Sequence, residues 1–271
     1  MLKFQVNSHQ PMRLVHFLHD QMKGACSLRA LKSDLEKNRC QVNGVTERYA
    51  SFRVKKGDRI TFLQKDIEEK KPNVLFEDDH LIIVDKQAWT TCDEKFMPPY
   101  RLVHRLDHQT TGVIILAKSH TAYQEMVKLF RERRVKKKYL AIVDGVPKGK
   151  KGTIEQNVRV MSRKGNQVTC GVSKWGKPSI THWNIEKKSA THAMISCLIE
   201  TGRTHQIRVH MKTLGNPILG DFQYSRTFSY KASVARVMLH AHMVSFTHPI
   251  TKERLEITAP IPKDFKELIP R

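Results

Sequence analysis

Apolar positions in the first 65 residues follow a helical pattern and then a strand-like one. Two stretches repeat apolar residues at intervals of three and four, which predicts two amphipathic helices. Their apolar positions are Leu14, Phe17, Leu18 and Met22 in the first and Leu28, Leu31 and Leu35 in the second. Ser27 directly precedes the second stretch and is a suitable N-cap. "QVNGV" (41–45) and "FRVKKGDRITFL" (52–63) then place glycine turns beside short β-type pieces. Residues 1–65 are therefore predicted to form a small α+β module.

A charged stretch with a proline, "QKDIEEKKPN" (64–73), follows this module and is typical of a linker. We place the linker at residues 66–73 and a second, larger domain at residues 74–271.

The larger domain mixes strand and helix patterns. Continuous apolar runs predict buried strands, and apolar residues at helical spacing predict two helices. The strand runs are 81–84, 113–117, 139–143 and 193–199, and the helical positions are Ala122, Met126, Leu129 and Phe130, followed by Ile207, His210, Met211 and Leu214. We expect a mixed α/β domain around a largely antiparallel sheet.

The net charge of the chain indicates which kind of molecule the protein binds. Lys and Arg number 48 against 26 Asp and Glu, a formal net charge of +22, which favours binding to a polyanion. Nucleic acid is the first interpretation and an anionic membrane surface the second; a protein that is merely basic is the third. The run "RERRVKKK" (131–138) fits either a solvated face or the wall of a polyanion path.

Several features favour a cytosolic protein. No window reaches the roughly 18 to 20 apolar residues that a membrane span needs. Polar residues and a proline interrupt the first 20 residues before a signal-peptide core could form. The five cysteines are scattered without CxxC pairs, which is typical of a reducing compartment.

Candidate metal sites and candidate catalytic serine or cysteine motifs are weak. Pairs among the 14 histidines match neither HExxH nor a zinc finger, and GxSxG and P-loop motifs are absent from the sequence. We therefore expect no metal and no cofactor.

One carboxylate stands out in this basic chain. "HRLDHQTTG" (104–112) places Asp107 two residues after Arg105, before the apolar run 113–117. Alternation in an extended segment puts both side chains on the same side. An Asp among arginines stays ionised and suits a nucleophile or a charge stabiliser. A structural Arg–Asp bridge beside a turn is an equal alternative from the residues alone.

Four motifs resemble those of the RluA-type pseudouridine synthases. They are "HRLDHQTTG" (104–112), "KKYLAIVDG" (137–145), "TGRTHQIRVHM" (201–211) and "LHAHMVSFTHP" (239–249), and "VLFEDDHLIIVDK" (74–86) resembles that family's domain opening. The small module resembles an S4 RNA-binding domain, with Arg29, Lys32 and Arg39 as phosphate-contacting residues on its helical part.

The resemblance implies an enzyme that isomerises uridine in RNA without a cofactor. Its implied catalytic residues are Asp107 as nucleophile, Tyr139 packed on the uracil and Arg208 paired with Asp107. Its implied RNA-binding residues are Arg105, which fills the space of the flipped base, Leu239, which floors the base pocket, and His205 and Gln206. Whether Asp107 attacks the base, attacks the sugar or removes a sugar proton stays open.

Two features depart from the family's pattern. "KQAW" (86–89) stands where relatives have KPAG, and the segment 87–103 is short. We expect a monomeric enzyme that modifies structured RNA, with large-subunit ribosomal RNA preferred over tRNA. A non-catalytic RNA-binding or ribosome-assembly protein is the alternative, and a metal-dependent nuclease ranks third.

Overall fold

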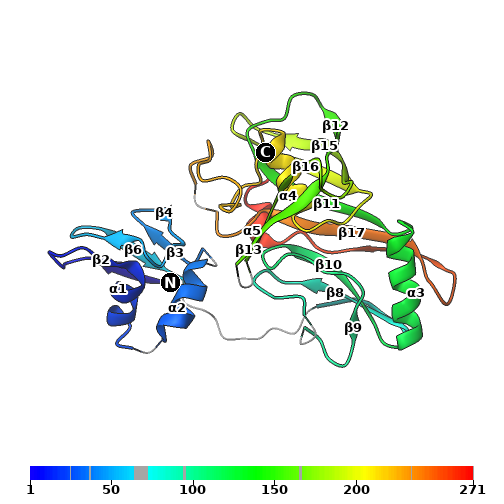
Figure 1. Ribbon diagram of the computed structural model, residues 1–271, viewed down its shortest axis with the longest axis horizontal. Helices are drawn as coiled ribbons and strands as arrows, with labels where there is room; N and C mark the ends of the chain where they lie inside the picture. Colours follow the sequence, from blue (N-terminus) through cyan, green and yellow to red (C-terminus); the bar gives the residue numbers. More distant parts are fainter. Residues whose placement is uncertain are drawn as a thin grey trace. The chain divides into compact units, whose positions relative to one another are not determined.

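The computed structural model describes residues 1–24, 26–36, 38–63, 73–93, 96–164, 167–232 and 234–270 (Figure 1). The chain divides into two compact units, one of Met1–Lys70 with Ala232–Arg236 and one of Lys71–Lys231 with Val237–Arg271. The predicted linker, 66–73, lies outside the described residues except for Asn73. In the described part of the chain, no helix is long and apolar enough to cross a membrane.

The first unit packs two short helices against small antiparallel sheets. Its elements are β1 (Leu2–Gln5), β2 (Met12–Arg13), α1 (Leu14–Gln21), α2 (Leu28–Glu36), β3 (Cys40–Val42), β4 (Val45–Thr46), β5 (Arg53–Val54) and β6 (Arg59–Phe62). One sheet has the order β1-β6-β3-β4, and β2 pairs with β5. The predicted helices are confirmed, whereas β1 and β2, which precede them, were not predicted.

Local sequence explains the ends of these elements. The Ser27 hydroxyl accepts a hydrogen bond from the Ala30 N–H at the start of α2, as expected of an N-cap. Asn43 and Gly44 turn the chain between β3 and β4 with φ of 54° and 82°, a conformation that Asn and Gly tolerate. Arg39 corrects one expectation, because it lies after α2 and not on a helix.

The second unit is built on a ten-stranded sheet. Its strands are β7 (Asn73–Glu77), β8 (Leu81–Lys86), β9 (Arg101–Leu102), β10 (Thr111–Ala117), β11 (Lys136–Asp144), β12 (Lys151–Glu155), β15 (Ile180–Lys188), β16 (His192–Ile199), β17 (Leu239–Thr247) and β18 (Arg254–Thr258). The main path is β12-β15-β16-β11-β17-β10-β8-β7, with β18 beside β17 and β9 beside β10. Among the strand pairs of this sheet in the described chain, only β10 and β17 run parallel. The prediction of a largely antiparallel sheet is confirmed.

The remaining elements are α3 (His120–Arg131), α4 (Gln206–Thr213), α5 (Lys263–Lys266) and the hairpin of β13 (Val158–Lys164) and β14 (Gln167–Val172). Side chains alternate across β8 and β10, so each strand contributes to two cores. Leu81, Ile83, Val113 and Ile115 pack with the apolar face of α3. Ile82, Val84, Ile114 and Leu116 pack on the other side with Leu106, next to Asp107.

Candidate active site

Asp107 lies in the loop between β9 and β10, and the buried Leu106 anchors that loop. Leu106 joins the second core, while Arg105 is exposed and Asp107 is half-buried. The expected alternation is therefore present, with Arg105 and Asp107 on the outer side of the segment. The Thr110 N–H donates to the Asp107 carbonyl at 3.0 Å and closes a turn directly after the carboxylate.

The end of β8 fixes the other side of this loop. Lys86 is fully buried, and its ammonium donates to the backbone carbonyls of Gln87 and His108. The Trp89 N–H donates to the same His108 carbonyl at 2.8 Å. Trp89 adopts φ of 67°, the left-handed conformation that favours glycine. A glycine at the end of the expected KPAG pattern would suit this conformation, and the departure from that pattern lies beside the loop of Asp107.

Gly112 allows β10 to approach β17. Its φ is 111°, and a Cβ at this position would lie 2.2 Å from the Ala241 carbonyl oxygen. Only glycine permits this contact, since any side chain would push the two strands apart. The glycine of "HRLDHQTTG" therefore sets the short parallel pairing that places the Asp107 loop beside β17.

Arg208 on α4 connects Asp107 to a second carboxylate. Its Nη1 donates to Asp107 Oδ2 at 3.1 Å. Its Nε and Nη2 donate to the two oxygens of Asp221 at 2.8 and 2.9 Å, and Nη2 also donates to Gln223. The Asp221 fork fixes the guanidinium plane, so Nη1 is aimed at Asp107.

His205 and Tyr224 complete the polar cluster. The Tyr224 hydroxyl accepts the Cys170 N–H at 2.8 Å and lies 2.7 Å from His205 Nδ1. His205 Nε2 faces Asp107 Oδ2 at 3.7 Å. The Arg208 guanidinium also lies over the Tyr224 ring, 4.9 Å from its centroid.

The cluster keeps Asp107 ionised. Burial alone would raise the pKa of the Asp107 carboxyl, but His205, Arg208 and Lys86 together hold it below its usual value. Burial lowers the pKa of His205 and the charge of Asp107 opposes that shift, whereas Arg208 is the permanent cation hydrogen-bonded to Asp107. Burial also disfavours the charge on Arg208, yet Asp221 and Asp107 raise its pKa above the ordinary range.

Tyr139 and Leu239 lie on neighbouring strands. Tyr139 on β11 is paired with Ala241 of β17, and Leu239 begins β17 and is buried. Tyr139 packs against the core that holds Leu106. Burial and then the negative charge of Asp107 raise the pKa of the Tyr139 phenol, so it stays protonated near neutral pH.

Other predicted residues lie elsewhere. Gln206 is buried, and its amide oxygen accepts a hydrogen bond from the Thr201 hydroxyl. Its amide nitrogen donates to the Ile180 carbonyl and the Thr181 hydroxyl, so these bonds hold the turn before α4. Arg29, Lys32 and Arg39 belong to the first unit, where the Arg39 guanidinium is paired with Asp34 at 3.0 Å.

Sequence reasoning missed Asp221, Gln223 and Tyr224. All three come from "GDFQY" (220–224). Its carboxylate, Asp221, follows Gly220 and lies 13 residues after Arg208. That acidic turn was the available signal. Within the described residues, no group of three or more His, Cys, Asp or Glu side chains is placed to hold a metal ion.

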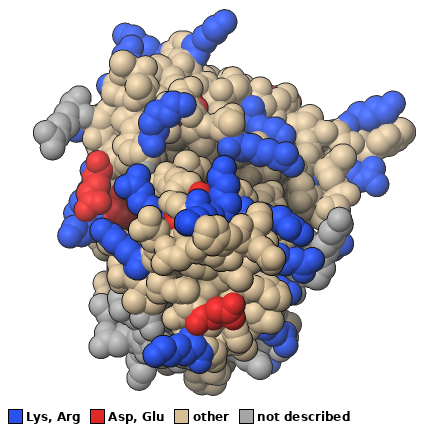
Figure 2. Space-filling view, turned by 90° about the vertical axis from the view of Figure 1, so that its left-hand side faces the viewer, with Lys and Arg blue, Asp and Glu red and all other residues tan. Residues whose placement is uncertain are grey.

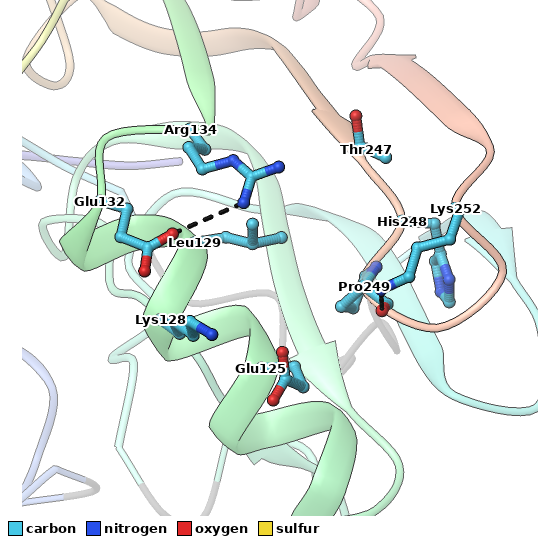
Figure 3. A pocket seen from close by; sticks show the side chains of 9 residues that line it. All are labelled: Glu125, Lys128, Leu129, Glu132, Arg134, Thr247, His248, Pro249 and Lys252. Atoms are coloured by element: carbon cyan, nitrogen blue, oxygen red, sulfur yellow. Dashed lines mark hydrogen bonds and ion pairs between the residues drawn. The ribbon is translucent and has the colours of Figure 1, made fainter.

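A hollow on the surface lies apart from this cluster (Figure 3). It is lined by Glu125, Lys128, Leu129, Glu132, Arg134, Thr247, His248, Pro249 and Lys252. Several of these groups already have internal partners. Arg134 pairs with Glu132, Lys252 donates to the Pro249 carbonyl, and His248 Nδ1 accepts the backbone N–H groups of Ile250 and Thr251. The "THP" (247–249) of the fourth motif is thus explained by a turn.

Comparisons with known proteins agree with the geometry. Residues 80–213, which contain Asp107, Tyr139 and Arg208, match the family model described as RNA pseudouridylate synthase. An uncharacterized RNA pseudouridine synthase of Chlorobaculum parvum is 33% identical, over 94% of this chain and 92% of that protein. This chain belongs to the RNA pseudouridine synthase family.

Other relatives carry more specific names. Ribosomal large subunit pseudouridine synthase D of Vibrio parahaemolyticus is 32% identical over 86% of this chain and 83% of its own length. Ribosomal large subunit pseudouridine synthase C of Buchnera aphidicola is 35% identical, over 72% of this chain and 69% of its own length. Among solved structures, human RNA pseudouridylate synthase domain containing 1 superposes with a TM-score of 0.63 at 26% identity, covering 73% of this chain and 86% of that chain.

Proposed function

We propose that this RNA pseudouridine synthase isomerises specific uridines in large-subunit ribosomal RNA, with Asp107 as the catalytic carboxylate. The names of the relatives support the substrate. The observation that carries the catalytic assignment is Asp107 itself, half-buried and held ionised by a guanidinium that Asp221 fixes in place.

The reaction needs no co-reactant, because the product is an isomer of the substrate. The bond between ribose C1′ and uracil N1 breaks, C1′ bonds to C5, C5 loses its proton, and N1 gains one, so that no atom is added or lost. An ionised Asp107 suits attack on the base, attack on C1′ or removal of a sugar proton equally well. Tyr139 stays protonated, so it serves as an apolar wall with a hydroxyl donor and not as a phenolate base.

Arg105 has the position required of a gap-filling residue. A stacked uridine must leave the helix before Asp107 can reach it, and the vacated space must be stabilised. Arg105 is exposed and lies two residues from Asp107 on the same side of the loop. In this proposal its side chain enters the gap while the base enters the pocket of Tyr139 and Leu239.

The first unit is proposed to be an S4-type RNA-binding domain, joined to the catalytic domain through residues 66–73. Its exposed Arg29 and Lys32 supply phosphate contacts, and the high net charge supports the same partner. A monomeric, cytoplasmic enzyme completes the proposal.

The test is to map pseudouridines in ribosomal RNA from cells with and without the gene. We expect one or a few large-subunit sites to lose pseudouridine in the deletion strain and to regain it with the wild-type gene but not with Asp107→Asn. Identical maps in all strains would contradict the function. A deletion strain with unchanged maps but defective ribosome assembly would support the non-catalytic alternative.

A further inference from the structure

Lys137 is a buried lysine without a counter-ion in the described part of the chain. It lies on β11, two residues before Tyr139, and only 8% of the residue is exposed. On β17, Lys137 is paired with Val244 and Tyr139 with Ala241, and the register shifts between Lys138 and Tyr139. A lysine that cannot pair or reach water is costly to keep.

The groups around its ammonium are aromatic rings, backbone and other cations. The Nζ lies over the Phe130 ring, 5.9 Å from the centroid, and Phe130 stacks on the His104 ring. A Cβ built at Gly202 would lie 3.8 Å from the same Nζ, so the turn before α4 runs past it. Burial, followed by the charges of Arg133 and Arg203, lowers the pKa of Lys137 to about 8.

The nearby groups that could act as anions are engaged elsewhere or uncharged. Glu200 accepts from His182 at 2.8 Å and lies 4.0 Å from Arg133. His104 Nε2 accepts the Ile115 N–H, so this ring is neutral and adds no charge beside Lys137. The charges of Arg133 and Arg203 act on Lys137. Arg203, whose Nε donates to the Pro178 carbonyl, lies in the turn before α4, where the positive end of the helix dipole also favours an anion.

We propose that Lys137, with Arg203 and Arg133, binds an RNA backbone phosphate next to the nucleotide whose base reaches Tyr139 and Asp107. The phosphate supplies the negative charge that Lys137 lacks in the free protein. The position fits, because Lys137 is two residues from Tyr139 along β11 and Arg203 is two residues from His205, which faces Asp107. The choice of RNA as the source of the phosphate rests on the proposed function.

The first experiment detects the phosphate directly and does not depend on activity. Lysine labelled with ¹³C at Cε is followed by NMR in the full chain, and the Lys137 signal is identified by its loss in Lys137→Met. Uridine 3′-monophosphate is expected to keep this lysine protonated to higher pH, whereas uridine is not. If the nucleotide leaves its titration unchanged at saturating concentration, or if uridine alone has the same effect, the phosphate site is wrong.

The second experiment measures affinity for a short labelled single-stranded RNA at several salt concentrations. Loss of one phosphate contact is expected to reduce the salt slope by about 0.7 and the affinity about fivefold at 0.1 M salt. Lys136→Met removes an equal charge from the adjacent, exposed position and is expected to change affinity less than twofold, as an approximate bound. If Lys137→Met and Lys136→Met reduce RNA affinity equally, Lys137 contributes only to the general positive charge of the protein, and the proposal is wrong.

Stability and single-turnover rates separate binding from other roles. Lys137→Met removes an unpaired buried charge, so the melting temperature is expected to hold or rise. The rate of pseudouridine formation at saturating enzyme is expected to stay within about threefold of wild type. The phosphate contact is made equally in the bound ground state and in the transition state, so its loss weakens binding and not the chemical step. A folded variant with normal affinity and a large fall in that rate would assign Lys137 to proton transfer instead. If wild type itself forms no pseudouridine, the proposed function fails while the phosphate titration still decides this site.

Discussion

At the scale of single residues, the site consists of two ion pairs that share Arg208, one with Asp221 and one with Asp107. Asp221 is almost completely buried and binds Arg208 through both oxygens, and Arg208 then reaches Asp107, whose side chain is 26% exposed. Two carboxylates share one guanidinium, and the exposed one faces the solvent where RNA would bind. The buried carboxylate thus positions the cation, and the cation keeps the outer carboxylate ionised.

Asp107→Asn is expected to abolish turnover while leaving the protein folded. The substitution keeps the shape but removes the charge and the nucleophilic oxygen. Because Arg208 retains Asp221 and Gln223 as acceptors, the free energy of unfolding is expected to fall by no more than about 2 kcal/mol. Product formation at excess enzyme, a melting curve and an RNA-binding curve test this, and measurable product from the folded variant would refute a direct catalytic role.

The lowered pKa of Asp107 also predicts the pH dependence. A depressed folded-state pKa means that the ionised carboxylate stabilises the fold above its unfolded pKa of about 3.9, and that this contribution is lost as the pH falls through the lower folded value. We therefore expect no loss of kcat/KM from titration of Asp107 between about pH 5 and pH 7. A fall of kcat/KM on the acid side of that range would contradict this expectation if the same fall remained in variants of His205 and Tyr224.

Asp221→Asn is expected to reduce both stability and activity. It leaves Asp107 as the charged partner of the buried Arg208 and removes the buried Arg208–Asp221 pair, and breaking a buried pair costs about 3 kcal/mol. Since Arg208 loses its fixed plane, pseudouridine formation should fall at least about tenfold even below the melting transition. Glu256→Gln, an exposed position on β18, is the control and should match wild type in both measurements.

Trp89 offers a test of backbone strain beside the loop of Asp107. A non-glycine residue in the left-handed region costs about 1 kcal/mol or more, and both Trp and Ala carry that cost. Trp89→Gly is therefore expected to be more stable than Trp89→Ala by about 1 kcal/mol, the reverse of the order in ordinary extended or helical backbone. Chemical denaturation measures the free energy of unfolding of both variants. If the alanine variant is as stable as the glycine variant or more stable, the backbone at this position is not strained.

At the scale of elements, the approach of β10 to β17 fixes where the loop that carries Asp107 ends. The pairing is limited to Thr111 with His240 and Gly112 with Ala241, and the Thr111 hydroxyl lies 2.9 Å from His240 Nδ1. β17 itself pairs with β11, which carries Tyr139. Thus one short parallel contact brings the Asp107 loop and the Tyr139 strand into the same neighbourhood.

Gly112→Ala is expected to destabilise the second unit severely. The new methyl group would lie 2.2 Å from a backbone oxygen, and backbone cannot move away as a side chain can. Gly215→Ala is the matched control, since it has φ of 87° but open space around the added carbon. The control should lose about 1 kcal/mol and Gly112→Ala at least about 3 kcal/mol more, measured by denaturant unfolding. Equal losses would mean that the strands can separate freely.

At the scale of the whole molecule, positive charge is distributed well beyond the active site. Figure 2 shows Lys and Arg side chains spread over the face in view, with few Asp and Glu side chains among them. With a net charge of +22, long-range attraction brings RNA to the protein, while specific contacts must come from a few positions.

Exposed basic residues of the first unit are expected to contribute to RNA affinity unequally. Arg29 and Lys32 are exposed on α2, whereas the Arg39 guanidinium is only 15% exposed in its pair with Asp34. The double substitution Arg29→Gln and Lys32→Gln should reduce the salt slope of RNA binding by about 1.4, and Arg39→Gln by less than about 0.5. An unchanged slope in the double variant would argue against phosphate contacts by this unit.

The sequence by itself determined the elements and the main catalytic candidate. Apolar spacing located both N-terminal helices, α3, α4 and the buried strands, because burial on one face imposes a period that can be read locally. Ser27 and Asn43-Gly44 act within a few residues of themselves, so their roles were also readable. The motif around Asp107 identified the family for the same reason: it is contiguous.

The family resemblance implied that Arg208 pairs with Asp107, but only the tertiary structure showed how that pair is held in place. Arg208 lies 101 residues away in sequence, and the fork that aims it comes from Asp221, which no local pattern marked as a partner. Gly112 could be seen as a glycine, but its reason, the Ala241 carbonyl, belongs to a strand more than a hundred residues later. Lys137 read as one charge in a basic run, and only folding buried it beside Phe130 and Gly202. Charges and close contacts act through space, so their partners are fixed by the packing of strands and not by their order along the chain.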